Sequence, residues 1–335
     1  MTHPDLGILG LGAAQVEAIG GGDTCRAWRV TRGDGSRVFV KQMPSGATEM
    51  AELEAAGLRW LGAEGMRVPE VVAVEGTLLA LSWVDGGSPT KAAAAALGAD
   101  LAALHSRPAS FFGCPPPGQP AARSGWVGAV RVPFSPPPEP PPTSLPEEGT
   151  GAPRDSPAVT RPSGSEPWQT EPWGTERGYG SWAEFYVDRR LVPTAAEAHR
   201  VGGLTDSMRR RIDDLCDALL TDSDAVGGPP VEPAPIHGDL WAGNVMWQVD
   251  APTLIDPSAV GGHPETDLAM LHLFGLPHVE TVVEAYQLVR PLPSDWRDRI
   301  PLHQVFPLLV HAVMFGSGYG AQAAAAASSA LRSAR

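Results

Sequence analysis

The segment IHGDLWAGNVMW, residues 236–247, carries the residue types with the clearest chemistry in this chain. Asp239 and Asn244 lie five positions apart within it, and Asp256 follows in the strand-like segment TLIDP. A carboxylate can take a proton from a hydroxyl group, and carboxylate and amide oxygens are hard ligands for Mg²⁺. Each residue alone would also suit a turn. The full spacing instead indicates phosphoryl transfer from ATP, with Asp239 as the base and Asn244 and Asp256 as magnesium ligands.

A lysine at the end of an apolar strand is the second candidate. Lys41 closes the segment RVFVK, and the 25 basic residues include only one other lysine, Lys91. Because arginine is so strongly preferred elsewhere, single arginines are weak evidence of function and a persisting lysine is stronger evidence. Glu54 follows thirteen residues later, and in kinases a helix glutamate orients a strand lysine against the nucleotide phosphates. Glu52 remains an alternative partner, and simple exposure remains an alternative for the lysine.

Three weaker signals complete the candidate site. Gly21 and Gly22 belong to a glycine run between two predicted strands, where backbone N–H groups could approach ATP phosphates, although most such runs are hairpin turns. Trp83 and Val84 end the last predicted strand of the N-terminal part, where main-chain groups could bind adenine. Trp241 follows the proposed base by two residues and could stack on a sugar or amine substrate, or pack as a structural tryptophan.

The elements that must position these residues fall into two groups. Alternating apolar patterns and turn residues predict strands, and a 3.6-residue apolar period predicts a helix, in this order: strands 13–19, 25–30 and 37–42, helix 47–62, strands 68–76 and 77–84. Ser88-Pro89 then predicts the N-cap and first turn of a helix, and the later pattern is mostly helical. The chain is therefore expected to be α+β, with a small antiparallel-sheet N-lobe at residues 1–84 and a larger, mainly helical C-lobe at residues 85–335.

Composition narrows the partners and the compartment. The 335 residues carry a net charge of -13, which argues against nucleic acid and anionic membranes as partners. Three cysteines without paired spacing predict neither a disulfide framework nor a zinc site. The sequence shows no signal-peptide pattern and no apolar run of about 18 residues. These observations predict a cytoplasmic protein.

A proline-rich tract interrupts the predicted C-lobe. Of the 35 prolines, 17 lie between Pro115 and Pro172. Residues 115–178, approximately, show neither helical nor strand periodicity, which predicts a disordered or polyproline II insertion. The tract could bind a proline-recognising partner, but the favoured interpretation is a tolerated expansion of a surface loop.

Beyond these residues, the chain resembles the fructosamine kinase (ketosamine-3-kinase) family, within a wider group that includes aminoglycoside and choline kinases. The resemblance covers nearly everything outside the proline-rich tract and is carried by GGGDTCRAW, VFVK, ELEAAGL, LGADLAALH, WAEFYVDRRLVP, IHGDLWAGNV, LIDPSAVGGHPETDLAMLHLFG and VMFGSGYG. It implies a protein-kinase-like two-lobed fold and ATP-dependent phosphorylation of the 3-hydroxyl of ketosamines, free or bound to protein. The phosphorylated adduct then falls away, which is deglycation repair.

Departures from the family pattern concern the side that would bind the acceptor. Gly262 to Glu265 read GHPE where the family usually has GDRE, and Pro307 and Val310 replace polar residues. Two alternatives therefore stay open. One is an aminoglycoside or choline-type small-molecule kinase, which would not require Trp241. The other is an inactive nucleotide-binding interaction module, against which the joint retention of the candidate residues counts.

Overall fold

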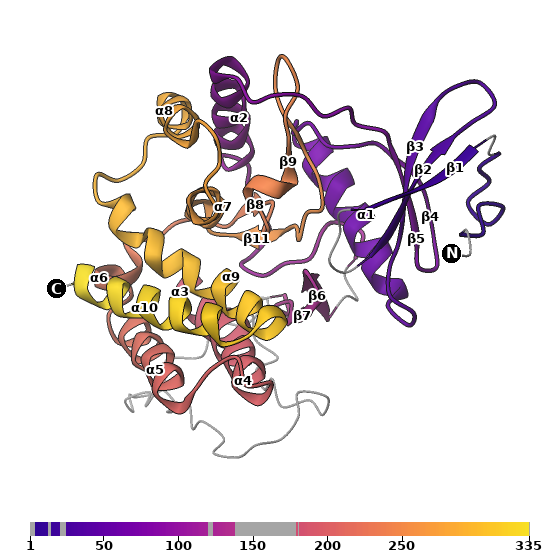
Figure 1. Ribbon diagram of the computed structural model, residues 1–335. Helices are drawn as coiled ribbons and strands as arrows, with labels where there is room; N and C mark the ends of the chain where they lie inside the picture. Colours follow the sequence, from indigo (N-terminus) through magenta and orange to yellow (C-terminus); the bar gives the residue numbers. More distant parts are fainter. Residues whose placement is uncertain are drawn as a thin grey trace, which may run out of the picture.

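The molecule consists of a sheet-containing lobe and a larger helical lobe (Figure 1). This arrangement confirms the predicted α+β, two-lobed fold. Gly21 and Gly22 lie outside the residues that can be described. The computed structural model describes residues 4–12, 15–20, 25–119, 123–137, 179 and 181–334.

Five antiparallel strands form the sheet of the N-lobe, in the order β1-β2-β3-β5-β4. Their bounds, which match the predicted segments to within a few residues, are β1 (Gln15–Ile19), β2 (Arg26–Thr31), β3 (Arg37–Gln42), β4 (Val71–Glu75) and β5 (Leu78–Ser82). Side chains on a strand point alternately to its two faces. Lys41 therefore shares a face of β3 with Phe39, and that face packs against a helix of the lobe.

Helix α1 (Thr48–Ala63) covers this face of the sheet and also reaches the C-lobe. An alanine- and leucine-rich side of the helix packs on the strands, and Glu54 is buried there with it. On the other side Gly57 permits a close approach, because a Cβ atom at this position would lie 3.1 Å from the Cβ atom of Ala259. α1 thus presents a glutamate at the boundary between the lobes.

Helix α2 (Lys91–Leu104) is the first helix of the C-lobe. Its N-cap is Thr90, whose side chain accepts a hydrogen bond of 3.1 Å from the backbone N–H of Ala93. The prediction that Ser88 is the N-cap is therefore wrong by two residues. Serine and threonine cap helices comparably well, so a sequence that offers both close together leaves the starting residue open.

A two-stranded hairpin of β6 (Ser124–Val127) and β7 (Val130–Pro133) also belongs to the C-lobe. It lies within residues 115–178, which the sequence predicts to be disordered or polyproline II. That prediction is wrong for the hairpin, whose inward-facing valines are buried in the C-lobe core. Alternating valines on one face give a strand enough packing to form among prolines. The prediction for residues 138–178, which hold ten of the 17 prolines, lies outside the described residues.

The buried, apolar helix α9 contacts α4, α7 and α10, whereas α5 packs against α10 and α8 packs against α2. Within the described residues, no helix is long and apolar enough to cross a membrane. The helices of this region are α3 (Trp182–Tyr186), the π-helical turn η1 (Val187–Leu191), α4 (Val192–Arg200), α5 (Asp206–Thr221), α6 (Ser223–Gly227), α7 (Pro264–Leu273), α8 (Val279–Val289), η3 (Trp296–Arg299), α9 (Ile300–Phe315) and α10 (Ser317–Ser333).

Two short strand pairs hold the segments that carry the candidate catalytic residues. β8 (Ala234–Ile236) pairs with β11 (Val260–Gly262), and β9 (Val245–Met246), which follows the 3₁₀ turn η2 (Ala242–Asn244), pairs with β10 (Thr253–Leu254). The loop after β8 and the loop after β10 therefore lie side by side, facing the sheet of the N-lobe. The predicted strand TLIDP is confirmed, although its paired part is only two residues long.

Candidate active site

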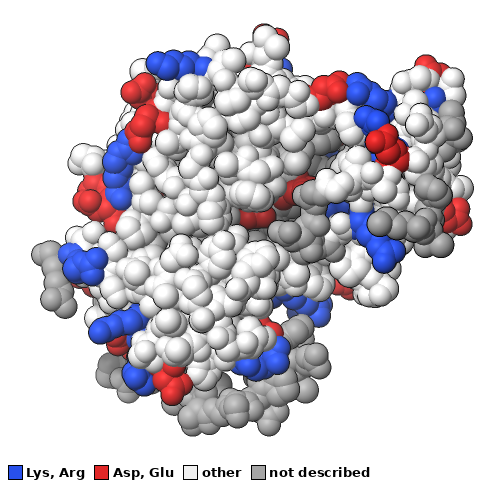
Figure 2. Space-filling view, viewed as in Figure 1, with Lys and Arg blue, Asp and Glu red and all other residues white. Residues whose placement is uncertain are grey.

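A cavity of about 410 Å³ lies between the two lobes. Its size is that of a small-molecule site. Figure 2 shows acidic atoms in the hollow between the lobes, surrounded on this face by a largely uncharged surface. Six of the predicted site residues line the cavity together: Lys41, Glu54, Asp239, Trp241, Asn244 and Asp256. The structure therefore brings together residues that are far apart in the sequence.

The ammonium group of Lys41 lies between two carboxylates. Its Nζ is 2.8 Å from Oε2 of Glu54 and 3.0 Å from Oδ1 of Asp256. Burial alone would lower the pKa of Lys41, but the charges of the two carboxylates outweigh it and raise this pKa, so the side chain stays charged. Glu52 is exposed. The predicted pair of Lys41 and Glu54 is therefore the one that forms, and the alternative of an exposed lysine is excluded.

Asp239 is a half-buried carboxyl group whose pKa lies near neutral pH. Burial raises the pKa of Asp239 to about 7, and the charge of Asp256 adds to this rise, whereas the hydrogen bond from Asn244 opposes it. A base works best when its pKa lies near the working pH. The position of Asp239 therefore suits it to accept a proton from a substrate hydroxyl.

Asn244 and Asp256 offer oxygen atoms to the same space. The amide nitrogen of Asn244 donates to the backbone oxygen of Asp239 at 2.8 Å, and its amide oxygen accepts no hydrogen bond from the described residues. Asp256 adopts a left-handed backbone conformation with φ of 54°, which is uncommon for a non-glycine residue. Uncharged and anionic oxygens of this kind are the ligands that Mg²⁺ prefers. The pair therefore fits a magnesium ion by its donor chemistry.

Asp267 of α7 holds the loop before Asp239 in place, and it was not among the residues predicted from the sequence. Its fully buried carboxylate accepts hydrogen bonds from the backbone N–H groups of His237 at 2.7 Å and Gly238 at 3.0 Å. A ring nitrogen of His105 lies 3.2 Å from the same carboxylate. Position 238 requires glycine for two reasons. Its φ is 79°, and a Cβ atom there would lie 2.3 Å from the backbone oxygen of Ser258. The signal in the sequence that could have indicated Asp267 is a carboxylate within the otherwise apolar segment DLAML.

Trp241 lines the cavity and is partly exposed, and its place beside an acceptor stays a prediction. The ring is 38% exposed and meets Phe274 edge-on at 6.0 Å between centroids. Its indole lies directly over Gly243, where any Cβ atom would come within 2.2 Å of the ring. The side chain is thus held by packing on one side while it offers another side to the cavity.

Trp83 and Val84 follow β5 at the link between the lobes, but neither side chain lines the cavity. Trp83 donates from its ring nitrogen to Asp85 at 3.0 Å, and the guanidinium groups of Arg29 and Arg37 lie over its ring. The side chain of Trp83 therefore has a packing role on the surface. In the described part of the chain, the backbone groups of both link residues pair with no other backbone group.

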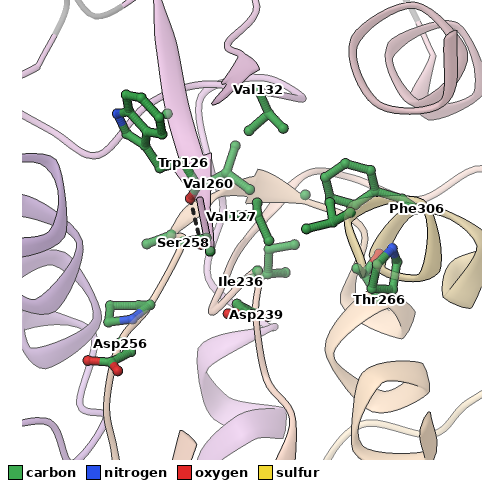
Figure 3. A pocket seen from close by; sticks show the side chains of 18 of the residues that line it. Trp126, Val127, Val132, Ile236, Asp239, Asp256, Ser258, Val260, Thr266 and Phe306 are labelled. Carbon is green, nitrogen blue, oxygen red and sulfur yellow. Dashed lines mark hydrogen bonds between the residues drawn. The ribbon is translucent and has the colours of Figure 1, made fainter. Parts of the chain in front are cut away.

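The part of the cavity beyond Asp239 and Asp256 is mainly apolar. Figure 3 shows Asp239 and Asp256 on one side and a group of apolar side chains beyond them, and it marks the hydrogen bond of 2.7 Å from Ser258 to the backbone oxygen of Trp126. This bond ties β6 to the loop of Asp256. The apolar side chains labelled there are Trp126, Val127, Val132, Ile236, Val260 and Phe306.

The fold has two lobes, and a strand lysine pairs with a helix glutamate between them. A half-buried aspartate and two further side chains that offer oxygen atoms lie in the same cavity. These features define a protein-kinase-like phosphotransferase. The family model for fructosamine kinase matches residues 10–116 and 171–333. The chain belongs to the fructosamine kinase family, and the resemblance seen in the sequence is confirmed.

Individual relatives agree with this membership. A Thermus thermophilus protein named "Probable ketoamine kinase" is 30% identical over 300 residues, which cover 89% of this chain and 87% of that protein. The crystal structure of a "putative fructosamine-3-kinase" from Thermobifida fusca superposes with a TM-score of 0.77 at 36% identity, covering 98% of this chain and 96% of the other. An aminoglycoside phosphotransferase in complex with streptomycin and ATP shares the fold, with a TM-score of 0.58 at 13% identity, covering 99% and 97%.

Proposed function

We propose that this protein transfers the γ-phosphoryl group of ATP to the 3-hydroxyl of ketosamines, the sugar adducts of amines. The observation that carries the proposal is the convergence of Asp239, Asn244 and Asp256 with the Lys41–Glu54 pair in one cavity. In the reaction, the bond between the γ-phosphorus and the ADP oxygen breaks while a bond to the 3-oxygen forms. The hydroxyl proton passes to Asp239.

The nucleotide side of the proposal assigns a role to each remaining predicted residue. Lys41, oriented by Glu54, binds the α- and β-phosphates as a point charge. Gly21 and Gly22 would add backbone N–H groups to the phosphates, and main-chain groups of the link residues 83 and 84 would bind adenine. In this scheme the N-lobe ends at residue 84, and the C-lobe from residue 85 carries the acceptor.

Magnesium is the metal that the donor set supports. Asn244 and Asp256 would hold it through oxygen atoms, and the bound ion would neutralise phosphate charge. The proposal predicts that ATP protects the protein against thermal unfolding only weakly when EDTA removes divalent cations. Asp256→Ala should lose the additional protection that magnesium confers, because it removes the anionic ligand.

The acceptor assignment rests on family membership and on the cavity. Trp241 would stack on the sugar or its amine, and the phosphorylated adduct would then decompose and release the amine. This is a repair reaction for glycated amines, in which we include both free and protein-bound acceptors. We place it in the cytoplasm, where cysteines stay reduced, and no disulfide joins the three cysteines of this chain.

One acceptor screen tests the proposal. Purified protein with ATP and magnesium should phosphorylate fructosyl-lysine and leave an aminoglycoside and choline unmodified. Trp241→Ala should lower turnover with the ketosamine by about tenfold, as expected when a desolvated contact between a cation and an aromatic face is lost, and should leave the ATP KM almost unchanged. Transfer to the aminoglycoside or choline without transfer to any ketosamine would contradict the assignment. Absence of transfer to every acceptor would favour the inactive module.

A further inference from the structure

A buried arginine at the acceptor end of the cavity has no carboxylate partner. Arg190 lines the cavity and is 5% exposed. Its Nη1 donates to the backbone oxygen of Pro133 at 2.6 Å and to that of Arg189 at 3.0 Å. Within the described residues, its Nε and Nη2 donate to no atom, and no carboxylate forms a salt bridge with it. A charged group that is buried in this way is costly unless an anion accompanies it.

The unused edge of this arginine has the geometry that binds a carboxylate. Nε and Nη2 lie on the same edge of a guanidinium group and can donate in parallel to two carboxylate oxygens. The protein itself contains such a pair, since Arg299 donates from Nε and Nη2 to the two oxygens of Glu265 at 2.9 and 2.8 Å. Arg190 offers the same edge, but the carboxylate must come from elsewhere.

The local backbone and ring contacts hold Arg190 in this position. It lies in the π-helical turn η1 (Val187–Leu191). Turns of this type are rare in proteins, and those that occur are frequently found at functional sites. The rings of Phe185 and Phe306 face its guanidinium carbon at 4.8 and 5.6 Å from their centroids. These contacts leave the side chain little freedom, so an anion would meet a preorganised donor.

The electrostatics around Arg190 favour an incoming anion. Burial first, and then the neighbouring charge of Arg189, lower the pKa of Arg190 to about 9 against smaller opposing effects of Tyr186 and Tyr179, and no carboxylate in the described part of the chain opposes the lowering. The acidic residues that line the cavity are, among the described residues, only Glu54, Asp239 and Asp256. A polycationic acceptor would therefore find no carboxylate near Arg190.

Resting on the proposed ketosamine kinase function, we infer that the preferred acceptors are ketosamines of free amino acids, whose carboxylate pairs with Nε and Nη2 of Arg190. The apolar walls beside it, which include Val127, Val132 and Phe306, suit an aliphatic or aromatic amino-acid side chain. A ketosamine on a protein lysine carries no carboxylate close to its amine. Such adducts should be the poorer substrates.

The test compares fructosyl-valine with fructosyl-valinamide, which differ in little but the negative charge. The wild-type protein should show a kcat/KM about 10- to 100-fold higher for the acid, as expected for a paired hydrogen bond between charged groups. Most of this difference should lie in KM. Arg190→Met should bring the ratio of the two substrates close to one, and Arg190→Lys, which keeps the charge but not the paired edge, should give an intermediate ratio.

The control is the adjacent buried arginine. Arg189→Met removes a similar side chain, whose Nε donates to the hydroxyl of Tyr179 at 2.7 Å, and should leave the acid-to-amide ratio unchanged. Calorimetric titration of both ketosamines in the absence of nucleotide gives the same comparison for binding alone. If Arg190→Met does not fold, the substrate pair on the wild-type protein and on Arg190→Lys still decides the question.

Three outcomes would overturn the inference. The first is equal kcat/KM for acid and amide in the wild-type protein, and the second is an unchanged preference for the acid in Arg190→Met. The third concerns the source of the anion: a fructosyl-valinamide 6-phosphate favoured through Arg190 would place the anion on the sugar. Transfer to both ketosamines at equal rates defeats this inference alone. Absence of transfer to any ketosamine defeats the proposed function.

Discussion

Replacing Asp267 by asparagine tests whether this buried carboxylate positions the catalytic loop. The change preserves the shape of the side chain but turns one acceptor oxygen into a donor. One carboxylate oxygen accepts from His237 at 2.7 Å and lies 3.2 Å from His105, and the other accepts only from Gly238 at 3.0 Å. The least costly orientation of the new amide therefore keeps the first oxygen and turns its NH₂ group toward the N–H of Gly238.

The magnitude follows from this single mismatch. One hydrogen bond to a charged acceptor is lost and two buried donors face each other, which should lower the free energy of unfolding by about 2–3 kcal/mol. Because Gly238 adjoins Asp239, the mismatch also displaces the proposed base. We expect kcat to fall about tenfold or more, with a much smaller change in the ATP KM, since each 1.4 kcal/mol of lost transition-state stabilisation costs about a factor of ten.

Urea unfolding and steady-state kinetics measure the two effects in the same preparation. Asp214→Asn on α5 is the matched control, because Asp214 pairs with Arg211 at 3.5 Å on the surface, where both side chains are exposed. This control should change the unfolding free energy by less than about 0.5 kcal/mol. Wild-type stability together with wild-type kcat in Asp267→Asn would refute the positioning role.

Three other substitutions give further expected outcomes. Asp239→Asn should abolish phosphoryl transfer and leave the Kd of ATP nearly unchanged in a binding titration, because an amide cannot accept the hydroxyl proton; near wild-type turnover would disprove the base assignment. Lys41→Arg should raise the ATP KM at least tenfold, roughly, because a planar fork does not fit the buried space beside Glu54, and unchanged kinetics would contradict this. Burial and the charge of His303 hold the pKa of His263 well below its usual 6.5. Below pH 6.5 the His263 ring therefore binds a proton in the unfolded chain but stays neutral in the folded protein. The free energy of unfolding in urea should then fall on acidification by up to about 1.4 kcal/mol per pH unit for this ring. His263→Asn should reduce this dependence on pH, and an unchanged dependence would contradict the role of His263.

Regular patterns made the nucleotide side of the protein predictable. The sequence paired Lys41 with Glu54 through the lysine–glutamate arrangement of kinases, while Glu52 and an exposed lysine stayed open, and the structure shows that the pair with Glu54 forms. Asp239 and Asn244 lie between β8 and β9, and Asp256 lies between β10 and β11. Their spacing in the sequence was recognisable because phosphoryl transfer needs a base and two magnesium ligands close together. Both patterns can be read from short segments of the sequence, but the roles of the residues came from the known arrangement of kinases.

The acceptor side depended on tertiary contacts that the sequence does not display. Arg190 lies in a π-helical turn, which shifts the direction of its side chain relative to the surrounding helices, and arginines were discounted because they are so common here. Asp267 lies in an apolar segment of a helix, and its partners are residues 105, 237 and 238. The hairpin of residues 124–133 was not predicted, because prolines surround it in the sequence and favour an irregular segment.

The two bonds of Lys41 also have a consequence for the order of folding. Its partner Glu54 is 13 residues away in the sequence, and its partner Asp256 is 215 residues away. The first contact can form as soon as β3 and α1 pack together, but the second requires a folded C-lobe and its docking onto the N-lobe, and docking of folded units takes milliseconds to minutes. The ammonium group therefore acquires its second carboxylate late, and a Lys41→Met variant should undock faster while its isolated sheet and helix still assemble at their usual rate.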